Sequence, residues 1–339
     1  MTSLRIVAVA AALGVGLALP ASAQTTLRVS NWLPPSHPIV KDIVVPWGEA
    51  VEEATEGRVE VEVMAAPIGS PPAQYDLIRD GAADVAFGVH GYTPNRFGLT
   101  TIAELPFLSD SSEDLSVAYQ EVHDAFFADA DEHRGVHLLG VWVHGPGGIY
   151  TTGEPVGSLE DTDGLKMRVG GGLANMVAQR LGMVPVSAPS PQVFEILSNG
   201  VADGILFPPE SVPFFRIDSV LKHGVEVPGG LYNTSFFMIM NSDTWDGLSD
   251  EDKAAIDGLS GVALARRAGQ AWDAADAAGR DAMTAAGMTL STAPEAFVGE
   301  ITEALDGVDA VFLDAAKEKG VDGEAALSAL REKVGAGGS

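Results

Sequence analysis

The first hundred residues alternate between two hydrophobic periods. Apolar side chains recur every three or four positions over 39–55, which predicts an amphipathic helix that ends at Gly57. Apolar and charged residues then alternate over 58–64, the period of a half-buried strand, and 27–31 predicts a short strand before the helix. Strand, helix and strand in this order indicate the start of an α/β layer.

Further along the chain, the apolar runs become nearly continuous. The segments 84–87, 136–143 and 231–240 are rich in apolar residues throughout, as expected of strands that are covered on both faces. A long helix is predicted over 113–132, and alanine with interspersed charge predicts another over 250–286. The pattern and the chain length together predict a globular α/β protein of two domains.

Composition removes several classes of function. The 339 residues include 47 acidic and 20 basic side chains, giving a formal net charge of −27, and no cysteine. The negative charge repels phosphate groups, which argues against nucleic acid and anionic lipid surfaces as partners. Without cysteine the chain has no disulfide, thiolate nucleophile, iron–sulfur cluster or thiolate zinc site.

The amino terminus has the pattern of a secretory signal peptide. Arg5 precedes an apolar run over 6–19, Pro20 interrupts it, and small residues occupy 21–23. A membrane anchor is the alternative, but the apolar run is shorter than the roughly 20 residues that span a bilayer. We therefore expect cleavage after Ala23 and export of a soluble chain.

Motifs for nucleotide, metal and nucleophile chemistry are missing from the sequence. No GxxxxGK[ST] or GxSxG segment occurs, and the glycines at 170–172 lack the GxGxxG spacing. His133 and His137 are four residues apart, but Gly135 lies between them at a predicted helix end and breaks the shared face. We therefore expect no metal, no cofactor and no catalytic residue.

One basic residue stands out in this acidic chain. Arg168 ends the apolar segment 165–169, directly before the glycine run and a predicted helix start. A guanidinium group can pair with a carboxylate through two hydrogen bonds, so this position favours a site for a small anion. The residues alone leave a buried salt bridge to one of the many acids as the alternative.

The loop after the strand 84–87 is a second candidate for the site. Ligands of open α/β sheets sit outside the carboxyl ends of strands, which makes His90 and Tyr92 candidates for the pocket. A surface turn capped by His90 is the alternative.

Several ordered motifs resemble one protein family. The motif Gly164-Leu165-Lys166-Met167-Arg168, the helix end at 199–204, and the strand 232–241 followed by Trp245 and 248–249 are similar to the substrate-binding subunit of tripartite ATP-independent periplasmic (TRAP) transporters. The resemblance covers essentially the whole mature chain. It implies a periplasmic-binding-protein-like fold, with a ligand cleft between two α/β domains and a long helix that spans both.

The resemblance also implies a function. It implies a periplasmic protein that closes on a small organic acid and delivers it to the small and large membrane subunits of a TRAP permease, with delivery and not chemistry as its task. We expect a monomer or dimer, with a signal peptide at 1–23, a first domain at 24–146 plus 235–275, and a second domain at 147–234 plus 276–339.

The family's carboxylate-binding arginine matches Arg168, but two other positions depart from the dicarboxylate and sialic-acid pattern. Gly148-Ile149-Tyr150 stands where many members carry a second arginine, and Phe207 stands where an asparagine is frequent. Fewer polar groups and more aromatic ones favour a monocarboxylate with an apolar or aromatic body. A dicarboxylate or a sugar acid is the alternative within the family, and an exported hydrolase is the alternative of another class.

The remaining expected site residues are aromatic or polar side chains near predicted strand ends. We expect two of the five aromatic residues among them to belong to the core instead of the pocket. These site residues are Phe207, Tyr150, His90, Tyr92, Asn31, Trp32, His144, Trp142 and Asn233.

Overall fold

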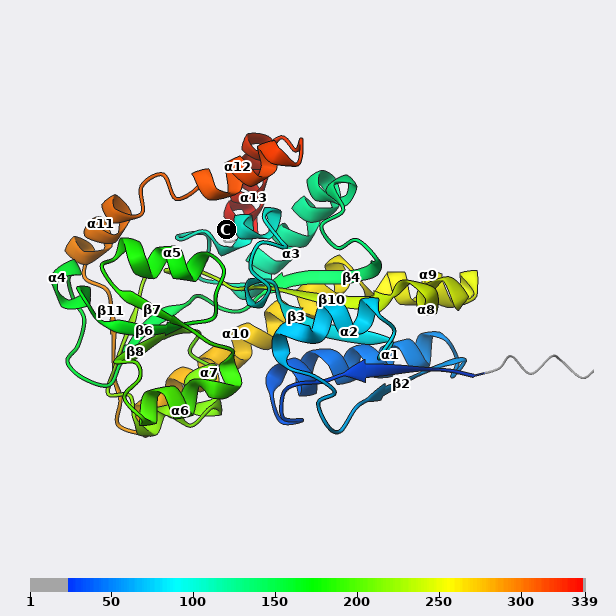
Figure 1. Cartoon of the computed structure of the whole chain (residues 1–339), viewed down its shortest axis with the longest axis horizontal. Coiled ribbons are helices and arrows are strands. Elements are labelled where there is room, and N and C mark those ends of the chain that lie inside the picture. The colour runs from blue at the N-terminus through cyan, green and yellow to red at the C-terminus, as the bar shows by residue number, and fades with distance from the viewer. Residues whose placement is uncertain (1–23, 338–339) are drawn as a thin grey trace, which may run out of the picture.

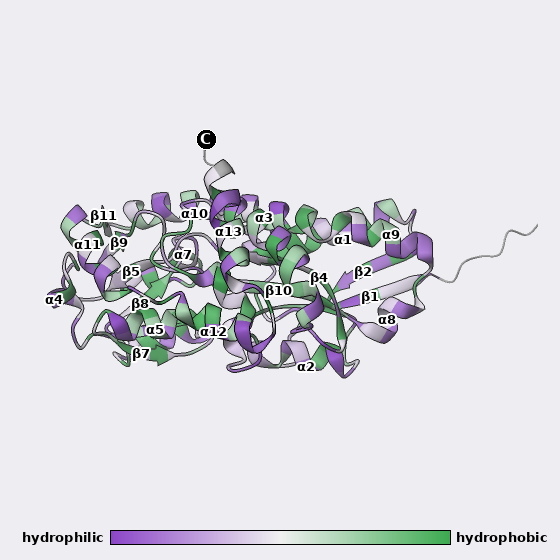
Figure 2. Ribbon diagram, turned by 90° about the horizontal axis from the view of Figure 1, so that it is seen from above, coloured by the Kyte–Doolittle hydropathy of each residue, from purple (hydrophilic) through white to green (hydrophobic). Residues whose placement is uncertain are grey.

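The computed structural model describes residues 24–337, so the expected signal peptide lies outside the described residues. Two mixed sheets lie one beyond the other along the longest axis of the molecule, each with helices on its faces (Figure 1). Hydrophobic segments occur in both halves, and hydrophilic ones alternate with them along the outer helices (Figure 2). Within 24–337, no helix combines the length and the apolar character that crossing a membrane requires.

The first sheet has the strand order β2-β1-β3-β10-β4. β1, β2 and β3 are parallel, and β10 runs antiparallel to both β3 and β4. All residues of β3 and β10 are buried, which explains their nearly continuous apolar sequence. The strands are β1 (Thr25–Ser30), β2 (Val59–Val63), β3 (Val85–Val89), β4 (Val136–Val143) and β10 (Ser235–Asn241), and the flanking helices are α1 (Val45–Ala54), α2 (Gln74–Arg79), α3 (Ser112–Val122), α8 (Ser242–Gly247) and α9 (Asp250–Leu259).

The second sheet has the strand order β11-β9-β5-β8-β6-β7. Its strands β6, β7 and β8 are parallel, and β5 is antiparallel to β8 and β9. The strands are β5 (Gly148–Thr151), β6 (Lys166–Val169), β7 (Val184–Ser187), β8 (Gly204–Phe207), β9 (His223–Glu226) and β11 (Thr289–Thr292), and the helices are α4 (Leu159–Thr162), α5 (Leu173–Arg180), α6 (Val193–Ser198), α7 (Ser211–Phe214) and α11 (Glu295–Ala304).

A single long helix connects the two halves. α10 (Val262–Ala285) contacts α3 and β4 at the first sheet and α7 and β11 at the second (Figure 1). The expected continuous helix over 250–286 is wrong in one respect, because α9 and α10 are separate helices. Gly261 lies between them with a positive φ of 55°, and its N–H donates to the Leu139 carbonyl.

The other long predicted helix is also interrupted. α3 begins at Ser112, where Ser111 caps it by accepting from the Asp114 N–H, and it ends at Val122. A π-helical turn and a 3₁₀ turn follow, and Asp131 adopts the left-handed conformation that ends the segment. The predicted helix over 113–132 is therefore confirmed as a helical segment that ends at Ala130, but only its first half is α-helical.

The carboxyl-terminal helices turn back toward the first sheet. α12 (Ala310–Glu318) contacts the 3₁₀ segment Leu99–Glu104, and α13 (Gly323–Gly337) packs on α3. We keep the expected domain boundaries as a proposal, with one change. The contacts of α12 and α13 favour assigning these two helices to the first domain. Below, the first domain means the elements that pack on the first sheet, and the second domain means those that pack on the second sheet.

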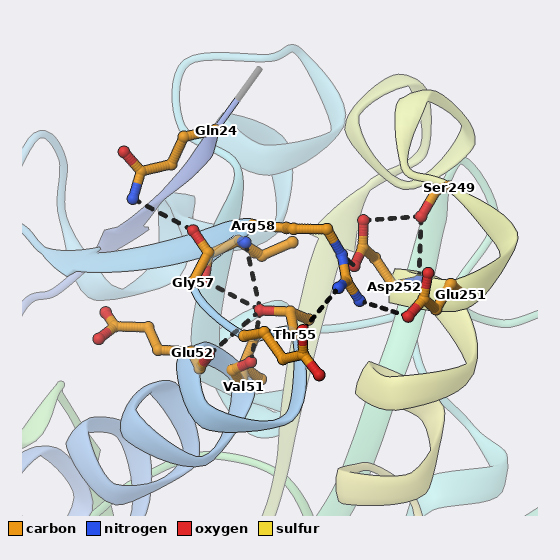
Figure 3. A network of polar contacts seen from close by, with 11 residues as sticks. Gln24, Val51, Glu52, Thr55, Gly57, Arg58, Ser249, Glu251 and Asp252 are labelled. Atoms are coloured by element: carbon orange, nitrogen blue, oxygen red, sulfur yellow. Dashed lines mark hydrogen bonds and ion pairs between the residues drawn. The ribbon is translucent and has the colours of Figure 1, made fainter. Parts of the chain in front are cut away.

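A polar network fixes the far end of the first domain, away from the second sheet. Arg58 Nε donates to Asp252 Oδ1 at 2.8 Å, which joins the start of β2 to α9 (Figure 3). The Thr55 hydroxyl donates to the Val51 carbonyl at 2.7 Å and closes the end of α1. This end of the domain is thus held independently of the cleft.

Candidate ligand site between the two sheets

A cavity lies between the two domains, beside the carboxyl ends of β3, β6 and β8. The space between its wall atoms amounts to about 440 Å³, part of it open to solvent. Aromatic and aliphatic side chains form most of its wall. The lining residues are Trp32, Leu33, His37, Ile39, Val89, Tyr92, His144, Arg168, Gly170, Ser190, Phe207, Pro208, Ser211, Phe215, Tyr232, Thr234, Phe236 and Trp272.

Arg168 is the cation of this cavity. Its side chain is 1% exposed, and its Nε and Nη2 atoms donate to the Ala188 carbonyl at 3.0 and 2.5 Å. The guanidinium carbon lies 4.8 Å from the centroid of the Phe207 ring. Among residues 24–337, no carboxylate lies within 4.0 Å of this guanidinium group, so the salt-bridge alternative is not what the structure shows.

Burial lowers the pKa of Arg168, and the neighbouring Tyr92 and Tyr232 raise it in part. A guanidinium group keeps its proton in proteins, so it cannot escape burial by becoming neutral. A buried charge without a counterion is costly, and an anion that enters the cavity removes that cost. The arrangement is chemically suited to receive one anionic group.

Tyr92 reaches across the cleft from the first domain. Its hydroxyl accepts a hydrogen bond from the Ser190 N–H of the second domain at 2.9 Å, and its ring meets Trp32 edge-on at 6.0 Å. Gly91, beside it, packs directly on the second domain: a Cβ there would lie 2.7 Å from the Gly172 nitrogen. The two domains are therefore in contact over the cavity.

Two buried histidines at the cavity are neutral. Burial lowers the pKa of His37 to about 3 and that of His144 to about 4. The Ile39 N–H donates to His37 Nδ1, so Nε2 of His37 carries the proton. His144 Nδ1 instead faces the Gly145 carbonyl, which can only accept, so Nε2 of His144 is left as an acceptor.

The structure brings five of the ten predicted site residues to the cavity wall. They are Arg168, Phe207, Tyr92, Trp32 and His144. Two of the five predicted aromatic residues lie in the core instead. Trp142 stacks on Phe236 at 5.7 Å, behind the wall, and the Tyr150 ring is fully buried in the apolar cluster under the second sheet.

The other three predicted polar residues act on the chain around the cavity and do not line it. Asn31 holds its loop by exchanging two hydrogen bonds with the Leu33 backbone, at 2.8 and 2.9 Å. The side-chain amide of Asn233 lies against the His144 and Gly145 carbonyls. His90 does not line this cavity and is not a surface cap, because it is 2% exposed and hydrogen-bonded inside the first domain.

Sequence reasoning missed several residues of the wall. Trp272 lies on α10, which crosses both domains, and Phe215 follows α7, which packs on α10. A lone tryptophan in an alanine-rich helix was a usable signal, since such a helix buries few large side chains. His37 stood in a proline-stiffened loop, which was a second signal.

Comparisons with known proteins agree with this architecture. The family model described as bacterial extracellular solute-binding protein, family 7, matches residues 29–312. A curated relative from Comamonas testosteroni, described as an outer membrane transporter protein, is 30% identical over 328 residues, covering 96% of this chain and 97% of its own.

Solved structures give the same result. A TRAP periplasmic solute-binding protein from Bordetella bronchiseptica with bound (R)- and (S)-mandelate is 43% identical with a TM-score of 0.90, covering 91% of this chain and 98% of its own. A marine metagenome TRAP protein described as specific for aromatic acid ligands is 33% identical with a TM-score of 0.86, covering 92% and 98%. The expected family and fold are confirmed: this chain belongs to the family 7 solute-binding proteins, the binding components of TRAP transporters, which are transport proteins and not enzymes.

Proposed function

We propose that this chain captures a monocarboxylate with an aromatic or apolar body and delivers it to the small and large membrane subunits of a TRAP permease. The observation that carries the proposal is Arg168, a buried cation without a carboxylate partner among the described residues, set in an otherwise neutral and aromatic cavity. The carboxylate pairs with the guanidinium group, and the ring or alkyl part packs among the aromatic side chains.

A second carboxylate on the ligand would have no cationic partner. Arg168 is the one permanently charged residue in the cavity wall as the structure describes it, and the two histidines there are neutral. Burying an unpaired carboxylate costs several kcal/mol, roughly a hundredfold or more in affinity. A sugar acid is less well matched, because each of its several hydroxyl groups needs a hydrogen-bond partner and aromatic and aliphatic side chains form most of the wall.

Relatives of known ligand support this substrate class. The Bordetella bronchiseptica structure contains mandelate, and a Rhodoferax ferrireducens TRAP protein that is 28% identical contains benzoate. The marine metagenome relative contains 3-hydroxybenzoate. All three ligands combine one carboxylate with one aromatic ring.

We also propose that the protein works in the periplasm after removal of residues 1–23. Relatives that match most of this chain are periplasmic solute-binding proteins, and the sequence of the first 23 residues has the signal pattern.

Isothermal titration of the mature chain tests the substrate class. We expect saturable binding of mandelate, benzoate or 3-hydroxybenzoate, and affinity for succinate, malate and glucuronate that is lower by roughly a hundredfold or more. As a control, the ligand is recovered after prolonged incubation with the protein. We expect it to be unchanged, since a hydrolase would generate product. Tight binding of succinate or malate without binding of the aromatic acids would contradict the proposal.

A further inference from the structure

A buried carboxylate connects the two domains beside the cavity. Glu104, at the end of the 3₁₀ segment Leu99–Glu104, is 2% exposed. Its Oε1 accepts from the N–H and the hydroxyl of Ser235, at 3.1 and 2.7 Å, where β10 of the first sheet begins. Its Oε2 accepts from the Leu173 N–H at 2.9 Å, where α5 of the second domain begins. One carboxylate therefore satisfies donors from both domains.

The glycine run after Arg168 makes this approach possible. A Cβ at Gly172 would lie 2.4 Å from Glu104 Oε2, and a Cβ at Gly171 would lie 2.3 Å from the Gly91 carbonyl oxygen. Gly171 and Gly172 also have positive φ angles of 99° and 59°. The run that failed to match a nucleotide-binding motif thus fits a close contact between the domains.

On the first-domain side, a directed chain of hydrogen bonds holds Glu104 in place. The Ser235 hydroxyl gives its proton to Glu104, so it must accept from His90 Nδ1, 3.0 Å away. His90 Nε2 then accepts from His133 Nε2, also at 3.0 Å. Each partner is buried, and the chain works in this direction only if Glu104 is an acceptor.

We infer that Glu104 is a positioning residue for ligand capture: anchored in the first domain, it holds the start of α5 and stabilises the closed arrangement in which Tyr92 and Arg168 share one cavity. In this inference, the contact between Gly91 and the 171–172 segment is the place where the domains separate to admit a ligand to the buried guanidinium group. Since the bond from Leu173 to Glu104 lies beside that contact, opening breaks it and closure restores it. The inference rests on the proposed function for its ligand.

Glu104→Gln tests the inference. In this variant the Gln carbonyl still accepts from Ser235, but the Gln amide NH₂ replaces the oxygen that accepted from the Leu173 N–H. Two donors then face each other, and they do so only in the closed state, where Leu173 is close to residue 104. We expect mandelate to dissociate about 10- to 100-fold faster, the cost of an unmet buried hydrogen bond. We expect the association rate and the melting temperature of the ligand-free protein to change little, because the mismatch is absent from the open state.

Glu132→Gln is the matched control. The Glu132 carboxylate is also buried, and it accepts from the Gly98 and Leu99 N–H groups, at 2.8 and 3.1 Å, where the 3₁₀ segment Leu99–Glu104 begins. These three residues belong to the first domain, and Lys319, which follows α12, lies 4.0 Å from the Glu132 carboxylate. We expect this variant to lower the melting temperature and leave mandelate dissociation unchanged. If Glu104→Gln behaves like Glu132→Gln, Glu104 is merely structural and the inference is overturned.

Distances between spin labels give a readout that does not depend on affinity. The chain has no cysteine, so Ala66→Cys and Ser198→Cys add labels at one exposed position in each domain. We expect mandelate to shift the wild-type distances to shorter values, and Glu104→Gln to need more mandelate for the same shift. Equal titrations of the two proteins would contradict the inference.

The proposed function fails separately, if the wild type binds neither mandelate nor benzoate. Glu104 is then judged from the ligand-free label distances. If the ligand-free wild type shows a population with shorter label distances and Glu104→Gln lacks it, the inference is supported. Identical distance distributions in the two proteins overturn it.

Discussion

Arg168, in the cavity wall, and the pair Glu210 and Asp276, where α7 begins against α10, are buried charged groups that respond to burial in opposite ways. Neither Glu210 nor Asp276 has a cationic partner among residues 24–337, since His37, 4.0 Å from Glu210, is neutral. Burial raises the pKa of Glu210 to about 7 and that of Asp276 well above its usual value. These acids can become neutral by binding a proton, whereas Arg168 stays charged.

The difference supports the role proposed for Arg168. A carboxyl group that neutralises itself needs nothing from outside, and Glu210 and Asp276 share a hydrogen bond from the Glu210 N–H to Asp276 Oδ1 at 2.8 Å. An arginine that cannot do so needs an anion, and the cavity gives one access. The unpaired Arg168 therefore favours an anionic ligand. The unpaired acids predict that the packing of α7 on α10 becomes less stable as the pH rises.

The largest expected effect comes from removing the cation. Arg168→Ala should weaken binding of mandelate or benzoate by about 3–5 kcal/mol, which abolishes it at ordinary concentrations, because the ligand carboxylate is left buried without a partner. Arg168→Lys should also bind poorly, since an ammonium group lacks the planar fork. Isothermal titration measures both variants.

Arg180→Ala is the control for Arg168→Ala. Arg180 is an exposed arginine of the same domain that donates to the Asp306 carbonyl, and its removal should leave affinity unchanged. Unaltered affinity in the Arg168→Ala variant would show that the ligand carboxylate binds elsewhere.

The acid pair predicts an effect of pH on stability. Because the pKa of Glu210 is raised on folding, from 4.5 to about 7, its stabilising contribution is present below pH 4.5 and is lost as the pH rises to 7. Glu210→Gln cannot ionise, so its stability relative to wild type should rise by about 2–3 kcal/mol between pH 5 and pH 8. Urea unfolding of both proteins at each pH measures the difference and cancels the contributions of the buried histidines.

Binding should not follow the same pH profile. Arg168 remains charged from pH 6 to pH 8, so the affinity for benzoate should stay nearly constant over that range. A stability difference between Glu210→Gln and wild type that is independent of pH would mean that Glu210 stays ionised in the folded protein.

The smallest effects distinguish a cleft tyrosine from a core tyrosine. Tyr92→Phe removes the acceptor of the Ser190 N–H across the cleft and should weaken binding about 5- to 10-fold. Tyr150→Phe removes a buried hydroxyl that has no partner among the described residues, and should leave affinity within about twofold. Titration of the two variants side by side tests the contrast, and equal losses of affinity would place Tyr150 in the ligand's path.

The sequence was informative where a local pattern carried the signal. Arg168 was a candidate because a basic residue before a glycine run is unusual in a chain with 47 acidic residues, and the family resemblance favoured a ligand-binding role over a salt bridge. The buried strands β3, β4 and β10 were also identifiable, since nearly continuous apolar runs are typical of covered sheets.

Elsewhere the missing information was tertiary. Trp142 and Phe236 are paired residues on neighbouring strands, yet Phe236 lines the cavity and Trp142 packs behind it, and alternation along one strand cannot say which ring faces the ligand. Glu104 meets its partners Leu173 and Ser235 across 69 and 131 residues of chain, so no local pattern indicates the contact.

The backbone contact between the domains has a consequence for protein engineering. At Gly91 there is no room for even one methyl group, because a Cβ would lie 2.7 Å from the Gly172 nitrogen. A single added carbon at this position acts as a wedge in the cleft while leaving Arg168 and the cavity wall chemically intact. Gly91→Ala thus offers a binding protein that stays partly open with ligand bound. Such a variant would distinguish whether the permease recognises the closed shape of the binding protein or the ligand that it carries.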